Sequence, residues 1–154
     1  LFTLDSVPEF NSIAQVLFSR AKSLGARSIA SKRGEGALVS SASDLNVFVN
    51  ALHGGHLIDP TELESMKSEM LPVRPFLSYG LGMMRLKLPK LPIGTKKAPL
   101  LYGRFGAFGS FAFIEATSNT FISGTVNQGA RPSIGFKLLT KIASHVLEAN
   151  QPGR

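Results

Sequence analysis

The sequence predicts an α+β fold in which an antiparallel β-meander is flanked by helices. Before Met70 and again after Pro132, apolar residues recur about every 3.6 residues, the period of a helix packed on one side. From Ser78 to Asn127 the apolar period is two, which predicts successive strands. Helices, a meander and a closing helix are therefore the expected order along the chain.

The composition is that of a globular chain of one domain at most. Its 154 residues are 44% hydrophobic and 18% charged, which excludes a disordered polymer. No apolar run approaches the ~20 residues of a bilayer-spanning helix, so we expect no transmembrane segment. The absence of cysteine excludes disulfides and thiolate metal sites. The opening Leu1-Phe2-Thr3-Leu4 has neither an initiator Met nor a signal peptide and suggests a piece of a longer polypeptide.

The formal charge of +7 is dispersed along the chain. Its one modest cluster is interrupted by prolines and predicts a solvated loop; it comprises Lys87, Lys90, Lys96 and Lys97. A basic domain that binds nucleic acid is the weakest interpretation, because exposed aromatic residues do not interleave with the cations. A flat salt dependence of binding would exclude it. We expect no nucleic-acid partner.

The first predicted helix runs from about Pro8 to Leu24 and ends at Gly25. Its apolar stripe consists of Phe10, Ile13, Ala14, Leu17, Phe18, Ala21 and Leu24. A basic connector follows up to Arg33. Residues 1–33 are therefore predicted to be an N-terminal helix with its connector, and residues 34–154 to be one further region.

The second predicted helix begins at Ser41, which caps it, with Asp44 reaching back three residues later. Gly54 and Gly55 end it. Its expected buried face comprises Ala42, Leu45, Phe48, Val49 and Leu52. This pattern of cap, stripe and glycine stop predicts the helix boundaries closely.

A third helix is predicted to start at once. Asp59 is the expected N-cap, Pro60 takes the first helical position, and Glu62 favours the positive helix end. The helix is expected to run to about Met70, where Pro72 and Pro75 stop it.

The strands of the meander are predicted at residues 79–88, 100–107, 110–115 and 120–127, with a long loop over residues 89–99. The last two form a hairpin through the polar turn Thr117-Ser118-Asn119. The closing helix, residues 132–149, carries the stripe Ile134, Leu138, Ile142 and Val146 with Leu139, Ala143 and Leu147.

The strand that begins at Tyr102 carries glycine at every third position: Gly103, Gly106 and Gly109. Glycine inside a strand indicates that something approaches the backbone closely. The segment is not a phosphate-binding loop, since such a loop is followed by a helix, and here a strand follows.

Two other short motifs carry little weight. Ser19 and Lys22 match Ser-x-x-Lys, in which the lysine activates a serine nucleophile, but this spacing is common on polar helix faces. His53 and His56 fall in a glycine break with no carboxylate spaced to complete a metal site. We expect neither a metal nor a cofactor.

Five segments between residues 34 and 149 form a recognisable set. They are Gly34-Glu35-Gly36-Ala37-Leu38-Val39-Ser40-Ser41-Ala42-Ser43-Asp44-Leu45, Gly55-His56-Leu57-Ile58, Tyr79-Gly80-Leu81-Gly82-Met83, the glycine-rich strand from Tyr102, and Gly124-Thr125-Val126-Asn127-Gln128. In their order and spacing these segments resemble the serine β-lactamase and penicillin-binding-protein-like family, in the branch of class C β-lactamases, esterases and D-amino-acid peptidases. The resemblance covers residues 34–149.

The resemblance implies a serine hydrolase whose pocket-lining strand carries a His-x-Gly or Lys-Thr-Gly motif. Arg104 stands where the His or Lys would be, Phe105 replaces the small or hydroxylated residue, and Gly106 matches the glycine. Arg104 is a candidate for facing a substrate carboxylate but cannot shuttle protons, and Phe105 would fill part of the cleft. The Ala107 backbone N–H would supply one oxyanion-hole donor.

Two functional hypotheses follow from the resemblance. In the first, the chain is the C-terminal portion of a serine hydrolase of amides or esters, with the nucleophile on an absent N-terminal part. Ser19 and Lys22 are too close to Gly34 to serve as that nucleophile pair. In the second, the chain is a non-catalytic relative that acts as a binding or assembly module. Either way the sheet would lack strands, so we expect self-association or a partner fragment; a monodisperse monomer would count against that.

Overall fold

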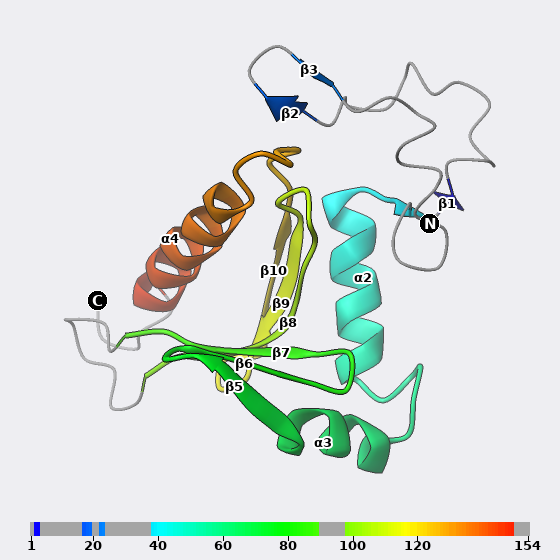
Figure 1. Ribbon diagram of the computed structural model, residues 1–154. Helices are drawn as coiled ribbons and strands as arrows, with labels where there is room; N and C mark the ends of the chain where they lie inside the picture. The colour runs from blue at the N-terminus through cyan, green and yellow to red at the C-terminus, as the bar shows by residue number, and fades with distance from the viewer. Residues whose placement is uncertain (1, 4–16, 20–21, 24–37, 90–97, 150–154) are drawn as a thin grey trace.

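The computed structural model describes residues 2–3, 17–19, 22–23, 38–89 and 98–149 (Figure 1). Its centre is a six-stranded antiparallel sheet. Figure 1 shows helices α2 (Ala42–His53) and α4 (Ser133–Ala149) on opposite sides of its last three strands, with α3 (Pro60–Ser68) at one end. The predicted α+β class is confirmed.

The large sheet is a meander, because each strand pairs with the next one in the chain. Its spatial order is β10-β9-β8-β7-β6-β5, and every pairing is antiparallel. The strands are β5 (Met70–Arg74), β6 (Leu77–Gly80), β7 (Met84–Lys87), β8 (Leu100–Phe105), β9 (Phe111–Glu115) and β10 (Thr120–Gly124).

Two short ladders lie outside the large sheet. β1 (Phe2–Thr3) pairs with β4 (Leu38–Val39), and β2 (Leu17–Ser19) pairs with β3 (Lys22–Ser23). The helix predicted over residues 8–24 is therefore wrong at residues 17–19 and 22–23, which are strands. Its other residues, and the basic connector up to Arg33, lie outside the described residues. An apolar stripe alone does not hold a helix together when its residues pair as a hairpin instead.

The N-caps predicted at Ser41 and Asp59 and the glycine end of α2 are confirmed. The Asp44 N–H donates to Ser41 Oγ at 3.0 Å, and Gly54 caps the other end of α2. In α3 the Thr61 N–H donates to Asp59 Oδ1 at 2.8 Å, and Pro60 opens the helix. These side chains satisfy amide groups that have no partner inside the helix, which is why these boundaries are readable in the sequence.

The core lies between the sheet and α4. Its buried members come from β7 and the residue after it, from β8 to β10 and from α4: Leu86, Leu88, Leu101, Phe111, Phe113, Ile122, Leu139 and Ala143. The predicted stripe of α4 is shifted, since Gly135, Leu139, Ala143 and Leu147 are buried whereas Ile134 and Leu138 are partly exposed. In α2 only Val49 is buried, so Ala42 and Phe48 do not form the buried face predicted for them.

The segment predicted as one strand over residues 79–88 is a hairpin. The β6 and β7 strands pair with each other and are joined by a turn at Leu81 and Gly82, where Gly82 has a φ of 71°. Residues after α3 also extend into an additional strand, β5, that the sequence did not predict. Pro72 is tolerated there because β5 is an edge strand, in which one missing N–H breaks no ladder bond on the solvent side.

The close backbone approach predicted at the glycines occurs within the protein itself. A Cβ at Gly103 would overlap the carbonyl oxygen of Ala112 and lie 2.7 Å from Phe113 Cα. At Gly109 it would overlap Val126, and the backbone of Gly109 in turn lies against Gly135 of α4. These glycines allow close packing of β8, β9 and α4, so their spacing reports internal packing.

Within the ranges described, no helix is long and apolar enough to cross a membrane.

Candidate functional site

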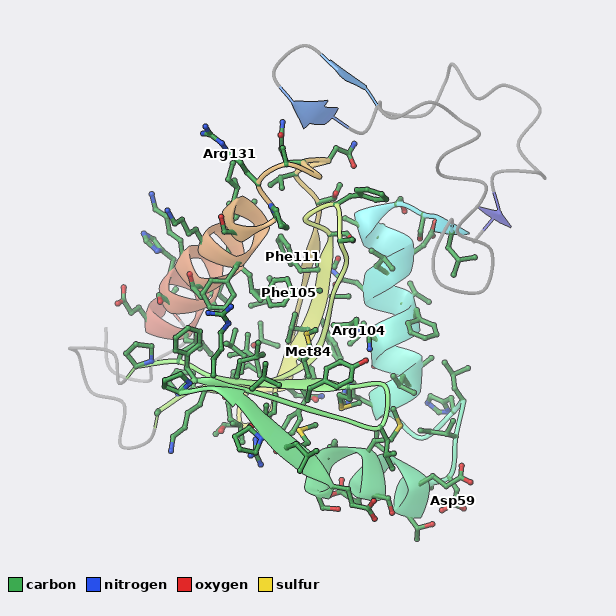
Figure 2. All side chains as sticks on the ribbon, viewed as in Figure 1. Asp59, Met84, Arg104, Phe105, Phe111 and Arg131 are labelled. Atoms are coloured by element: carbon green, nitrogen blue, oxygen red, sulfur yellow. The ribbon has the colours of Figure 1, made fainter. Side chains whose placement is uncertain are left out.

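The candidate site lies at the end of β8, where consecutive residues point to opposite faces of the sheet. Arg104 pairs with Ala112 of β9, and Ala112 pairs on its other side with Ser123 of β10. Residues paired in this way point to the same face of the sheet. The Ser123 hydroxyl donates a hydrogen bond to the Ala42 carbonyl oxygen of α2. Arg104 is therefore on the α2 face. Figure 2 shows Arg104 between the sheet and α2, whereas Phe105 and Phe111 point toward α4.

The Arg104 side chain ties the β6–β7 hairpin to β8. Its Nη1 donates to the Tyr79 hydroxyl and, at 3.3 Å, to the Gly82 carbonyl oxygen. Its guanidinium carbon also lies 4.9 Å from the centre of the Tyr79 ring, a cation–π contact. The backbone ladder between β7 and β8 ends at Gly103. Beyond that point, the side-chain hydrogen bonds of Arg104 connect β8 to the β6–β7 hairpin. Its remaining guanidinium donors have no hydrogen-bond partner among the residues that the structure describes.

Ala107 lies in a tight turn directly after β8. The turn is closed by the Gly109 N–H, which donates to the Gly106 carbonyl at 3.1 Å, while the Gly106 N–H bonds to Ser110. Ala107 is exposed, and in the described part of the chain no hydrogen bond uses its N–H. The turn after β8 thus holds a backbone donor that has no hydrogen-bond partner among the described residues, three residues after Arg104.

Phe105 belongs to the core. Its ring centre lies 4.8 Å from that of Phe113, 6.4 Å from that of Phe111 and 5.6 Å from that of Phe136 in α4. It packs on the face of the sheet opposite Arg104, so it does not fill a cleft beside that side chain. A ring buried among other rings explains why a bulky residue occupies this strand position.

A second polar cluster lies on the α2 side of the sheet, where α3 meets β8. Lys67 Nζ is 2.8 Å from Glu64 Oε1 and 5.9 Å from the centre of the Tyr102 ring. Burial, and then the positive charge of Lys67, lower the pKa of His53 to about 4, against a smaller opposing effect of Glu64. His53 is therefore neutral in the folded protein near neutral pH.

This lowered pKa predicts acid sensitivity. The ordinary pKa of histidine, 6.5, applies to the unfolded chain, whereas the pKa of His53 in the folded protein is about 4. As the pH falls from 6.5 toward 4, the unfolded chain binds a proton that the folded protein does not bind. The free energy of unfolding is therefore highest above pH 6.5 and decreases over this range. We expect the urea midpoint to fall over this window, and the fall to be smaller in His53→Gln. An unchanged pH profile in that variant would contradict the lowered pKa.

The structure describes Ser19, Lys22, His53 and His56, the residues of the two weaker sequence motifs. Ser19 and Lys22 pair with each other in the β2–β3 ladder, so they are not one turn apart on a helix. Among the described residues, no group of three or more His, Asp or Glu side chains is arranged to hold a metal ion. The basic loop lies outside the described residues from Lys90 to Lys97.

The sequence pointed to Arg104, Gly106 and Ala107, which follow one another along the chain at the end of β8 and in the turn after it. It did not identify Tyr79 or Lys67 as neighbours of β8. Tyr79 belongs to one of the segments that resemble the family. The sequence predicts one continuous strand through Gly82, so it does not indicate that the chain turns back there and brings Tyr79 to β8.

The chain matches no model of a known protein family and no curated protein sequence. The family resemblance therefore depends on the segments quoted above.

Proposed function

We propose that this chain supplies the pocket-lining strand of a serine hydrolase of the β-lactamase and penicillin-binding-protein-like type, which cleaves amides or esters through an acyl-serine. The observation that carries the proposal is the exposed Ala107 N–H, held by the turn after β8 and unused by other hydrogen bonds in the described chain. A preorganised backbone donor of this kind stabilises the oxyanion of acyl transfer.

In this proposal Arg104 binds the substrate. The hydrogen bonds of Arg104 to Tyr79 and Gly82 both come from Nη1. The donors on Nε and Nη2 are left to bind a carboxylate in a bidentate fashion. Arginine stays protonated and cannot act as the general base. The serine and its base therefore come from polypeptide outside the described residues.

The chemistry has two steps. The serine oxygen attacks the substrate carbonyl and loses its proton to the base, and the carbonyl oxygen gains the negative charge that the Ala107 N–H stabilises. The amine or alcohol then leaves with that proton, and water releases the acyl group by the same route in reverse.

A non-catalytic binding or assembly module is the second candidate. Arg104 is bonded to Tyr79 and Gly82, and Phe105 is committed to the core, so the strand has structural roles that need no reaction. This interpretation keeps the fold and the carboxylate-binding guanidinium but predicts no acyl-enzyme.

Labelling with a fluorophosphonate and with a fluorescent penicillin distinguishes the two candidates. The probes are applied to this chain and to the longest natural polypeptide that contains its sequence. We expect the probes to label the longer polypeptide at a serine outside residues 38–149, and to leave residues 38–149 unlabelled in both proteins. Absence of label on both would contradict the hydrolase proposal and leave the binding module.

A further inference from the structure

The Arg104 side chain is exposed, and yet its guanidinium is held by three contacts. Nη1 donates to the Tyr79 hydroxyl and, at 3.3 Å, to the Gly82 carbonyl oxygen. The guanidinium carbon also lies over the Tyr79 ring, 4.9 Å from its centre. An arginine at the surface loses much rotamer freedom when it is fixed in this way. The contacts therefore define one orientation of a group that solvent and ligands can reach.

Tyr79, which makes two of these contacts, is itself fixed by the sheet. It lies in β6, where it pairs with Leu71 of β5 on one side and with Met84 of β7 on the other. Its side chain is half-buried. The ring and its hydroxyl thus form a rigid support for the guanidinium.

The carbonyl group of Gly82, the third contact, is fixed by the turn between β6 and β7. Gly82 has the left-handed φ of 71°, and the Gly80 N–H donates to the Met83 carbonyl oxygen at 2.9 Å. Met83 is 2% exposed, so the end of the hairpin is anchored in the core. An added Cβ at Gly82 would meet Met66 Cε at 3.7 Å, an ordinary contact. Glycine is therefore needed here for its backbone conformation, which sets the direction of the carbonyl.

One edge of the Arg104 guanidinium is left without a partner in the described part of the chain. Both hydrogen bonds use Nη1, so the donors on Nε and Nη2 remain. Among the described residues the one ion pair joins Lys67 to Glu64, and no carboxylate pairs with Arg104. Two parallel donors of a guanidinium match the two oxygens of a carboxylate.

We infer that Tyr79 is a positioning residue for Arg104, which it holds with the Nε and Nη2 edge ready to bind a carboxylate ligand. A guanidinium that is ordered before the ligand arrives does not lose that freedom on binding, so the ligand binds more tightly. A lysine ammonium has no plane to stack on the ring and no fork, so this arrangement is specific to arginine. The inference rests on the part of the proposed function in which Arg104 binds a carboxylate, and does not depend on the serine chemistry.

The test is a titration of this chain, with its arginines labelled with ¹⁵N, followed by NMR at the Nε–H signal of Arg104. Arg104→Lys identifies that signal by removing it. The probe is benzoate, and benzamide is its uncharged counterpart. We expect benzoate to shift the signal saturably with a Kd of about 1–10 mM, and benzamide to leave it unchanged. Tyr79→Leu should weaken benzoate binding at least about fivefold, and Tyr79→Phe, which keeps the ring, about twofold to threefold.

Tyr102→Leu is the matched control. Tyr102 is the other tyrosine of the chain and lies two residues before Arg104 on β8, but its cation–π contact is with Lys67. We expect its substitution to change benzoate affinity less than about twofold. Dispersed amide spectra show whether each variant is folded. A merely structural role of Tyr79 would lower the unfolding midpoint of its variants and leave the benzoate affinity of the folded protein unchanged.

Three results would each overturn the inference: no saturable shift at about 50 mM benzoate, an equal response to benzamide, or equal benzoate affinities of the unsubstituted chain and Tyr79→Leu. Fluorophosphonate labelling of the longer polypeptide separates this inference from the proposed hydrolase. Labelling combined with benzoate binding that ignores Tyr79 would overturn the inference and support the hydrolase. Benzoate binding that depends on Tyr79, with no labelling, would support the inference and contradict the hydrolase.

Discussion

Replacing Gly103 by alanine is expected to destabilise the protein by more than about 3 kcal/mol, a large part of the ~5–15 kcal/mol that holds a domain folded. The added Cβ overlaps the Ala112 carbonyl oxygen and lies 2.7 Å from Phe113 Cα. Both are backbone atoms of β9, and Gly103 pairs directly with Phe113. The strands cannot separate to make room without breaking the ladder at the centre of the sheet.

Gly55→Ala is the control for Gly103→Ala. Gly55 has a φ of 74°, but the nearest atom to an added Cβ is Pro60 Cγ at 3.5 Å. Alanine there incurs only the left-handed backbone cost of about 1–2 kcal/mol. Urea denaturation followed by circular dichroism measures both variants. Equal losses would show that β8 and β9 are not in this close contact.

The second large effect is expected for Phe113→Ala, with a loss of about 3–5 kcal/mol. The Phe113 side chain is fully buried in the core, and its ring centre lies 4.8 Å from that of Phe105. Truncation removes apolar contacts and leaves a cavity that the surrounding strands fill only in part.

Phe76→Ala tests whether this loss comes from burial. Phe76 also contacts another ring, that of Phe136, but is 43% exposed. We expect it to cost less than about 1.5 kcal/mol, since much of its surface stays in water in the folded state. If Phe76→Ala were as damaging as Phe113→Ala, the core would not lie where we place it.

The sequence predicted best those elements whose ends are set by local chemistry. Ser41 and Asp59 cap their helices through hydrogen bonds to residues two or three positions away. The strands β8, β9 and β10 and helix α4 are also close to their predicted bounds, because alternating or helical apolar patterns continue across each of them.

The errors arose where partners distant in sequence decide the structure. Leu17 to Ser19 satisfy a helical stripe yet pair with Lys22 and Ser23. The turn at Gly82 interrupts an alternating pattern that reads as continuous from Tyr79 onward. At the site, Phe105 packs against Phe136, which comes from α4. Arg104 donates a hydrogen bond to Tyr79, which the β6–β7 hairpin brings close to β8.

The most direct test of the proposed function is the rate at which a fluorophosphonate phosphonylates the serine of the longest natural polypeptide containing this chain, with and without Ala107→Pro. Ala107 is the second residue of the turn from Gly106 to Gly109, a position that accepts proline, so the fold should persist while the N–H is lost. We predict a rate lower by about 10²–10³ with an unchanged unfolding midpoint. An equal rate of phosphonylation in the two proteins would contradict the role of this strand in the active site.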